Sequence, residues 1–240
     1  MHYLGINNLK KNYDGKHIVS GVSMDVKSKE IIGLLGPNGA GKTTTFYMIL
    51  GLIAPDDGAV ILDGENLNNF PMYMRARKGI SYLPQEPSIF RKLSVEDNIR
   101  SVLEIAGVKG QQQQERLESV LEEFNLFPFA KRFGYQLSGG ERRKVEIARS
   151  IALNPFFILL DEPFAGIDPI SIIDLKKTIE QLKKDGIGLI ITDHNVRETL
   201  SITDRAYIIS GGGIFAHGTP SELIADESVK KTYLGADFKL

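Results

Sequence analysis

Cysteine is absent from the 240-residue sequence, which excludes disulfide scaffolds and thiolate metal sites and fits a reducing compartment. The four histidines are scattered and show no metal-ligand spacing. No apolar run approaches the ~20 residues that span a bilayer, and none follows the charges near the start, so we expect no signal peptide and a cytoplasmic location. The formal net charge of -1 provides no global basic field for nucleic acid or anionic membranes.

What is present is typical of a folded globular protein. Hydrophobic residues make up 42% and charged residues 25% of the chain, which argues against disorder. The length suits one substantial domain or two closely packed lobes, and no internal repeat is found. Two short basic clusters occur at 75–78 and 142–144. We predict that both are solvated helix faces.

The first part of the sequence predicts strands around a glycine-rich loop. Residues 1–30 predict short strands separated by turns. An apolar run at 30–35 predicts a buried strand, which leads through glycines into a helix at 43–52. Another strand is predicted at 59–62. A strand followed by a glycine-rich loop and a helix is the setting in which phosphate groups are bound.

The middle of the sequence turns helical between residues 94 and 154. Leu117, Val120, Leu121 and Phe124 recur at the spacing of one buried helix face. Apolar strands are then predicted at 156–160 and 188–192, with a helix at 170–184 between them. Near-continuous apolar strands that alternate with helices indicate a parallel sheet covered on both faces. We expect a single domain over 1–240, with a nucleotide-binding core at 1–85 and 151–240 and an inserted helical subdomain at 86–150.

The glycine-rich loop matches the phosphate-binding pattern G-x-x-x-x-G-K-[ST] in full. Its glycines let backbone N–H groups converge on phosphate oxygens, while Lys42 reaches the β- and γ-phosphates of ATP and the Thr43 hydroxyl holds Mg²⁺. An ordinary glycine turn would not require the Lys-Thr pair. The predicted binding residues are Gly36, Pro37, Asn38, Gly39, Ala40, Gly41, Lys42, Thr43 and Thr44.

Two carboxylates follow the apolar strand at 156–160. Adjacent acids beside a hydrophobic core cost free energy unless a cation or hydrogen bonds compensate them. Asp161 suits the Mg²⁺ shell, and Glu162 is placed to orient the attacking water. Acids that cap a helix after a strand-end turn are the alternative, which this pair alone does not exclude. Together with the phosphate loop, the pair favours hydrolysis.

Ser138-Gly139-Gly140-Glu141 precedes an amphipathic helix on which Val145, Ala148 and Ala152 share a face. Taken alone, Ser138 and Glu141 form a capping box, which an ordinary helix start explains. The segment lies about twenty residues before the acidic strand end, and this order resembles the signature of the ABC ATPase family. The fold that this resemblance implies is α/β, a P-loop NTPase core with a parallel sheet, an N-terminal antiparallel β subdomain and an inserted helical subdomain.

Other residues match the family in order along the whole chain. Gln85 resembles the glutamine that links the core to the helical subdomain and reaches Mg²⁺, and Asp168 lies in a loop similar to the one that couples two sites. His194 resembles the switch histidine that contacts the γ-phosphate, although a lone histidine is more often structural. Tyr13 lies where the family stacks an aromatic ring on adenine. The resemblance implies a homodimer in which Lys42 of one subunit and Ser138 of the other enclose each ATP.

Finer features place the chain among separate transporter ATPases. It lacks a long coiled-coil insertion and a second ATPase domain. Glu141, Asn195 and the runs LSGGERRKVEIARS, DEPFAGIDPI and ITDHNVRETL are similar to the ATPase subunits of lipopolysaccharide-export transporters. That similarity implies two multi-span membrane subunits, a single-span membrane subunit, no nucleic acid, and a place on the cytoplasmic face of the inner membrane.

The same similarity implies a groove near 84–93 that receives a short helix from each membrane partner. Phe90 would be its apolar anchor and Arg91 its charge contact, or Phe90 packs in the local core. Three other functions stay open: the ATPase of a branched-chain amino acid importer, a soluble ABC-type ATPase that clamps nucleic acid, and a different phosphate-loop enzyme. The near-neutral charge argues against the second. The absence of an Asn-Lys-x-Asp motif argues against a GTPase.

Overall fold

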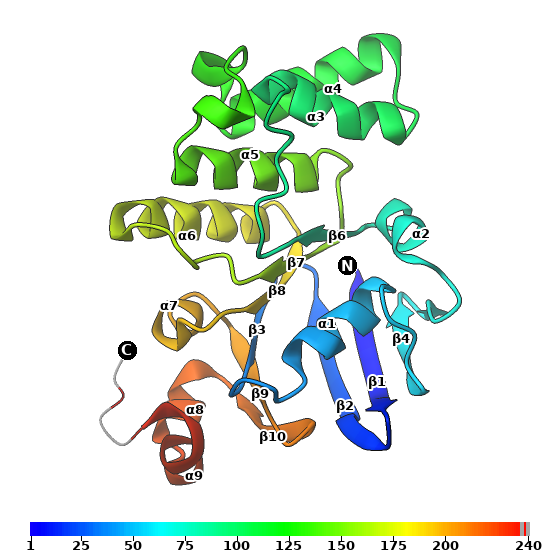
Figure 1. Ribbon diagram of the computed structural model, residues 1–240, viewed down its shortest axis with the longest axis vertical. Coiled ribbons are helices and arrows are strands. Elements are labelled where there is room, and N and C mark those ends of the chain that lie inside the picture. The colour runs from blue at the N-terminus through cyan, green and yellow to red at the C-terminus, as the bar shows by residue number, and fades with distance from the viewer. Residues whose placement is uncertain (236–237, 239–240) are drawn as a thin grey trace.

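Two sheets organise residues 1–235 and 238, the part of the chain that the computed structural model describes (Figure 1). The antiparallel sheet has the order β2-β1-β4-β5 and contains β1 (Tyr3–Tyr13), β2 (Lys16–Lys27), β4 (Asp57–Leu62) and β5 (Glu65–Asn66). The second sheet has the order β10-β9-β3-β8-β7-β6. It contains β3 (Ile31–Leu35), β6 (Ile80–Leu83), β7 (Phe157–Asp161), β8 (Gly188–Thr192), β9 (Arg205–Ser210) and β10 (Gly213–Gly218). All its pairings are parallel except that of β10 with β9.

Strands do form within residues 1–30, but the expectation that they are short is wrong, because β1 has 11 residues and β2 has 12. Leu4 and Ile6 are buried, and the next buried apolar residue of β1 is Leu9. The spacing between buried residues is therefore three at this point, where regular alternation requires two. The strand register shifts there, and Asn8 has a φ of 50°. This bulge makes one continuous strand look like two short ones in the sequence.

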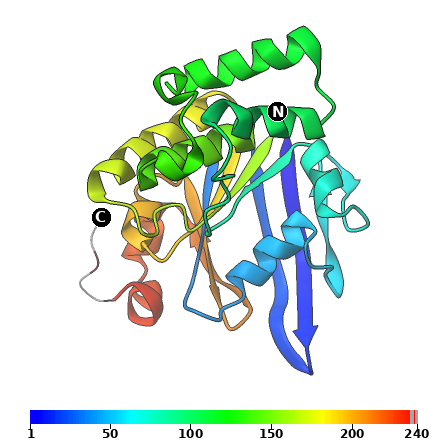
Figure 2. The same cartoon turned by 45° about the horizontal axis from the view of Figure 1, so that its top comes forward.

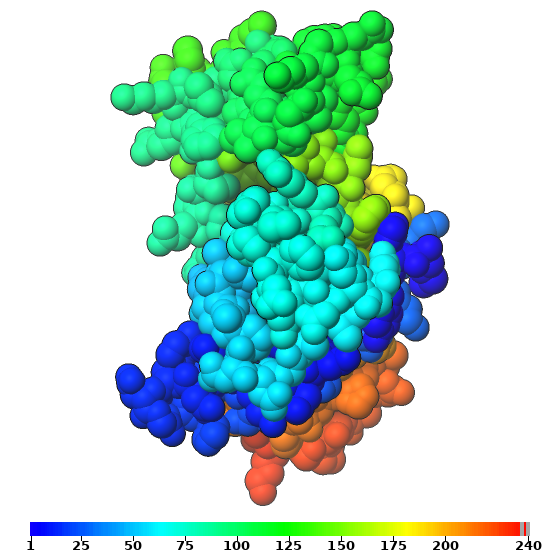
Figure 3. All heavy atoms as spheres, turned by 90° about the vertical axis from the view of Figure 1, so that its right-hand side faces the viewer, coloured from blue at the N-terminus to red at the C-terminus, as the bar shows by residue number. Residues whose placement is uncertain are grey.

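Helices occupy the remaining segments. On the core they are α1 (Lys42–Leu50), α2 (Met72–Arg77), α6 (Pro169–Lys184), α7 (Val196–Leu200), α8 (Pro220–Ala225) and α9 (Glu227–Val229), followed by a π-helical turn at Lys230–Leu234. Between β6 and β7 lie α3 (Val95–Ile105), α4 (Gly110–Glu123) and α5 (Gly139–Ile151), with 3₁₀ turns at Phe127–Phe129 and Gly134–Gln136. Figure 2 shows the β1–β2 hairpin extending away from α3–α5, and Figure 3 shows the green helical residues at one end of the molecule.

The parallel sheet is covered on both faces, as its apolar strands predict, and every residue of β7 and β8 is buried. Helices α3–α6 pack on one face, where the predicted α4 face of Leu117, Val120, Leu121 and Phe124 is buried. The other face packs against α1 and the antiparallel sheet. The α/β fold with an antiparallel N-terminal sheet is therefore confirmed. No helix within the described residues is long and apolar enough to cross a membrane.

Each of the two basic clusters contains an arginine that is not solvated, which makes the prediction of exposed helix faces wrong for both. Arg75 is 1% exposed, and its guanidinium donates to the carbonyls of Met48 (2.8 Å), Ile49 (2.7 Å) and Phe70 (2.8 Å). It thereby donates to carbonyls in the last turn of α1, where helical N–H donors become scarce. Arg143 is 8% exposed and bonds within the site described below.

Candidate nucleotide-hydrolysis site

The residues singled out by sequence follow four neighbouring strands of the parallel sheet. The phosphate loop follows β3, Gln85 follows β6, Asp161 ends β7 with Glu162 next, and His194 follows β8. These strands lie side by side in the order β3-β8-β7-β6. Because the carboxyl ends of parallel strands meet at one edge, the fold gathers all these side chains there.

The backbone of the phosphate loop has a conformation that residues other than glycine rarely adopt. Gly36, Gly39 and Gly41 have φ values of 148°, 74° and 105°, in the region that glycine alone enters without strain. A Cβ on Gly36 would also lie 2.2 Å from the Ile209 carbonyl oxygen. Lys42 begins α1, and its ammonium donates to the carbonyls of Gly36 (2.7 Å) and Pro37 (3.0 Å). Burial lowers the pKa of Lys42, while Glu162 and Asp161 oppose that shift.

Glu162 is held by two predicted partners. Gln85 Nε2 donates to Glu162 Oε2 at 2.7 Å, and His194 Nε2 lies 2.6 Å from Glu162 Oε1. The backbone of Glu162 has a φ of 45°, a left-handed conformation that costs a non-glycine residue free energy and is often found at functional sites. Burial raises the pKa of Glu162, His194 lowers it, and Asp193 and Asp161 raise it further. The three predicted catalytic residues therefore form one group joined by these contacts.

Asp161 is 6% exposed and accepts a hydrogen bond from the Tyr82 hydroxyl at 3.1 Å. Burial is the main reason why the pKa of Asp161 is raised. Thr43 is exposed at the start of α1. Within the described residues, no three His, Cys, Asp or Glu side chains surround a common metal position. One carboxylate with one hydroxyl nevertheless fits Mg²⁺, which takes few protein ligands and completes its shell with phosphate oxygens and water.

Two residues of this region were missed from sequence. Tyr82 precedes the Pro84-Gln85 pair and looks like an ordinary strand residue. Asp193 is 3% exposed and accepts hydrogen bonds from the backbone N–H groups of Phe164 and Asn195, both at 2.8 Å. It thereby ties the segment after β7 to the segment after β8. Its position beside His194 was the available signal.

Arg143 and Glu146 of α5 connect the helical segment to the strand ends. Arg143 donates to the carbonyls of Pro84 (2.8 Å) and Asp161 (3.3 Å). Its Nη1 lies 3.3 Å from Glu146 Oε2, and Glu146 Oε1 accepts from the backbone N–H of Ser88 at 2.6 Å. The pair is almost fully buried, and burial lowers the pKa of Arg143. The segment that carries Gln85 is therefore fixed to α5.

Other predicted residues lie apart from this cluster. Ser138 begins α5 with the expected capping box, in which its hydroxyl and the Glu141 carboxylate exchange bonds with backbone N–H groups. Asp168 begins α6 and accepts from the Ser171 N–H at 3.0 Å. In Figure 1, α5, which follows Ser138, lies above β6 and β7, while α1, which follows the phosphate loop, lies below them.

Tyr13 ends β1 near the tip of the β1–β2 hairpin and is 44% exposed. The hairpin passes the phosphate loop a few residues later, since a Cβ on Gly41 would lie 2.7 Å from the Ile18 carbonyl oxygen. Phe90 is 46% exposed and stacks under the Arg149 guanidinium, 4.6 Å from the ring centroid, which argues against the local-core alternative. Arg91 is exposed beside it.

Comparison with known proteins agrees with this fold. Residues 19–165 match the family model described as ABC transporter. The chain is 55% identical over 241 aligned positions to the lipopolysaccharide export system ATP-binding protein LptB of Escherichia coli K12, with 100% of both chains covered. It is 50% identical to the LptB protein of Acidithiobacillus ferridurans over 99% of this chain and 98% of that one. The crystal structure of the ADP conformation of MJ1267, an ATP-binding cassette of an ABC transporter, superposes with a TM-score of 0.87 at 28% identity, covering 98% and 99% of the two chains. This chain belongs to the ABC transporter family and is an ATP-hydrolysing subunit with the ATP-binding cassette fold.

Proposed function

We propose that this chain is the ATPase subunit of a transporter that extracts lipopolysaccharide from the inner membrane of a Gram-negative bacterium towards the outer membrane. The observation that carries hydrolysis is the Glu162 carboxylate held between Gln85 and His194, beside the phosphate loop. The cargo rests on full-length similarity to proteins named for lipopolysaccharide export. That similarity also favours export over the amino acid importer and the nucleic-acid clamp.

ATP is the substrate, and the loop from Gly36 to Thr44 is proposed to hold its phosphates. The backbone N–H groups at the start of α1 point along the helix axis and favour negative charge. Lys42 exchanges its loop carbonyls for the β- and γ-phosphates, a move that the flexible ammonium side chain permits. Tyr13 stacks its exposed ring on adenine.

Thr43, Asp161 and Gln85 are proposed to hold Mg²⁺, with Asp161 acting through a bound water. The bound ion supplies charge neutralisation at the β- and γ-phosphates. Asp161 is suited to this place because Tyr82 and the backbone fix its carboxylate at the end of β7. Because the Asp161 carboxylate is buried, a neighbouring cation lowers the free-energy cost of its negative charge.

Glu162 is proposed to accept a hydrogen bond from the attacking water and to polarise it. Catalysis of this kind typically contributes ~10²–10⁴-fold. The raised pKa of Glu162 makes its carboxylate a stronger base than that of a solvated glutamate. Gln85 and His194 fix both carboxylate oxygens, so the direction of approach is set before the substrate binds.

Two copies of the chain are proposed to pack head to tail. Ser138, Gly139, Gly140 and Asp168 are proposed to complete the site of the second copy, because α5 and α1 of one chain lie on opposite sides of β6 and β7 in Figure 1. ATP then contributes to the closed dimer, and hydrolysis allows it to open. Residues 86–150 form the helical subdomain in this proposal, and Arg143 with Glu146 transmits its position to the Gln85 segment.

Membrane partners are proposed to bind the surface around Phe90 and Arg91. The Phe90 ring is partly exposed next to the Arg149 guanidinium, and the exposed Arg91 follows it in the chain, which suits a short helix with apolar and acidic residues. The proposed partners are two multi-span subunits and a single-span subunit. The chain would then sit on the cytoplasmic face of the inner membrane.

The experiment for hydrolysis compares Glu162→Gln with Glu180→Gln, an exposed glutamate of α6. Glu162→Gln should bind ATP with unchanged affinity and release almost no phosphate, because the amide keeps the shape but not the basicity. Glu180→Gln should behave as wild type. Wild-type phosphate release by Glu162→Gln would remove the catalytic role.

A second experiment tests the cargo. The tagged chain is purified from its host in mild detergent, and co-purifying proteins are identified by mass spectrometry. Two multi-span subunits with a single-span subunit that carries a periplasmic lipid-binding domain are expected. Amino acid permease subunits would overturn the export proposal and leave the hydrolysis proposal intact.

A further inference from the structure

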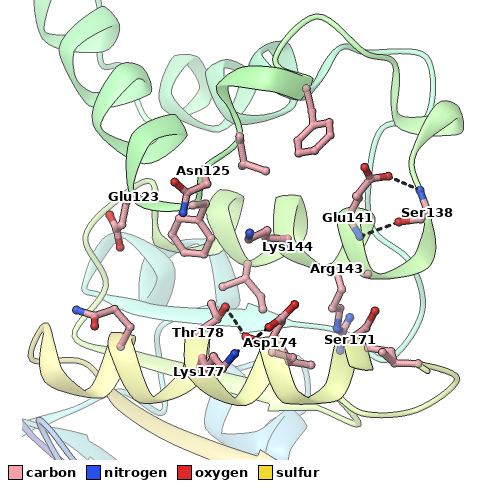
Figure 4. Close-up of a pocket in the computed structure, with 18 of the residues that line it drawn as sticks. Glu123, Asn125, Ser138, Glu141, Arg143, Lys144, Ser171, Asp174, Lys177 and Thr178 are labelled. Atoms are coloured by element: carbon pink, nitrogen blue, oxygen red, sulfur yellow. Dashed lines mark hydrogen bonds and ion pairs between the residues drawn. The ribbon is translucent and has the colours of Figure 1, made fainter. Parts of the chain in front are cut away.

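A cavity of about 560 Å³ lies between α6 and the helices above it (Figure 4). Residues along α6 form one wall, and α5 with the turn after α4 forms the other. Small-molecule sites typically occupy ~300–1,000 Å³, so the cavity is large enough for a ligand. Glu162, Gln85 and His194 do not line it, but Ser138 and Gly140 do, so the cavity is separate from the Glu162 cluster and borders the residues proposed to meet the nucleotide of a second copy.

Both walls contribute apolar side chains among polar and charged ones, namely Phe124, Leu126, Phe129, Ile147, Leu175 and Leu182. Most of them belong to the buried core between the sheet and the helical segment. The apolar part of a ligand would therefore displace water from side chains that belong to the hydrophobic core.

Most charges that line the cavity are already paired. The pairs are Glu141 with Arg132, Arg143 with Glu146, and Asp174 with Lys177. Lys144 differs, because among residues 1–235 and 238 its ammonium makes no hydrogen bond or ion pair, although the side chain is half-buried. Figure 4 shows Lys144 extending into the middle of the cavity.

One carboxylate limits the ligands that fit. Glu123 lines the same cavity, and Figure 4 places it at the end opposite Ser138. Burial raises the pKa of Glu123, and Arg116 opposes this shift. A ligand with several negative charges would meet this carboxylate and that of Asp174. A single negative charge directed at Lys144 avoids this repulsion.

We propose that the cavity binds an amphipathic monocarboxylate, with the carboxylate on Lys144 Nζ and the apolar body between α5 and α6. The ion pair satisfies an ammonium that has no partner within the described residues. The apolar body lies against the apolar side chains of α5, α6 and the turn after α4. Binding requires no nucleotide in the same chain.

A ligand in this cavity would also restrain α5 relative to α6, a consequence that rests on the proposed function. The two helices approach closely at their starts, where a Cβ on Gly140 would lie 2.7 Å from Ser171 Oγ. They carry Ser138 and Asp168, the residues proposed to meet the second copy. Holding them at a fixed spacing should slow closure of the dimer. The ligand should therefore lower kcat for ATP without changing KM.

Binding is measured without nucleotide, using the fluorescent carboxylate dansylaminoundecanoate on the full chain. Saturable binding to wild type is expected. Lys144→Met should weaken it about tenfold, because the variant keeps the aliphatic length and loses a charge-assisted hydrogen bond. Lys184→Met removes an exposed lysine of α6 outside the cavity and should bind as wild type. Thr178→Trp should block binding by filling the cavity from α6.

Thermal unfolding of each variant verifies folding before its affinity is compared. Absence of saturable binding to folded wild type, or equal affinity of Lys144→Met and wild type, would overturn the proposal. Unchanged binding to Thr178→Trp would place the probe elsewhere and overturn it as well. Inhibition of ATP hydrolysis is measured separately, so a failure of the hydrolysis proposal does not alter the binding result.

Discussion

Replacement of Glu146 by leucine tests whether α5 is fixed to the strand ends through a buried ion pair. The Glu146 side chain is 3% exposed and that of Arg143 is 9% exposed. Glu146 Oε1 accepts from the N–H groups of Ser88 (2.6 Å) and Ile89 (3.1 Å). The substitution therefore leaves one buried guanidinium without its counter-charge and two backbone donors without their acceptor.

Removing one partner of a buried pair typically costs about 3–5 kcal/mol of unfolding free energy. Arg143 keeps the carbonyls of Pro84 and Asp161 as acceptors, which offsets part of this loss, but the two orphaned N–H groups add to it. We expect about 4 kcal/mol for Glu146→Leu. Arg143→Met should cost less, about 1–3 kcal/mol, because Glu146 then keeps both backbone donors.

Denaturant unfolding at neutral pH measures both variants, with Glu104→Gln on the exposed face of α3 as the control that should change little. The double variant Arg143→Met/Glu146→Leu should recover part of the stability because no buried charge remains. A Glu146→Leu cost below that of Arg143→Met would refute the reasoning. Each folded Arg143 or Glu146 variant should release phosphate more slowly than wild type, because residues 84–89, which include Gln85, are then held less firmly against α5.

Three further predictions follow from buried groups. Arg75→Met should lower the unfolding free energy by about 3 kcal/mol, measured by denaturation, because three carbonyls lose a charged donor. Tyr82→Phe should weaken Mn²⁺ binding several-fold in the presence of a non-hydrolysable ATP analogue, measured by paramagnetic resonance, because the Asp161 carboxylate loses its hydrogen bond. The kcat of hydrolysis should fall as pH drops through the raised pKa of Glu162, since only the carboxylate acts as base. His194→Ala should move this acidic limb to higher pH, because the histidine lowers that pKa.

The strand ends could be predicted because each is a short local pattern. An apolar strand followed by charged or glycine residues was enough to find the phosphate loop and Asp161, whereas His194 was identified through the resemblance to the ABC ATPase family. The parallel order of the strands then brought them together, and this followed from the alternation of strands and helices. The side-chain roles on ATP remain predictions, because they depend on a substrate and a second copy.

Other features depended on contacts between distant residues. Arg75 and Arg143 look like surface charges in sequence, and only the carbonyls they meet, up to 59 positions away for Arg143, explain their burial. Asn8 interrupts the strand pattern because a bulge changes its phase. Tyr82 gives no local signal, since its hydroxyl acts through a residue 79 positions later.

The close approach of Gly140 to Ser171 affects how genetic results at the signature segment should be interpreted. A methyl group at position 140 would meet Ser171 Oγ at 2.7 Å and Ser171 Cβ at 3.2 Å, independently of any nucleotide. A loss of activity in Gly140→Ala would therefore have two causes that the single variant does not separate, namely steric displacement of α6 and weaker phosphate binding. Ser171→Gly removes both clashing atoms and should act as an intragenic suppressor of the steric part alone. Whatever defect persists in the double variant measures the contribution of Gly140 to nucleotide binding in the proposed head-to-tail dimer.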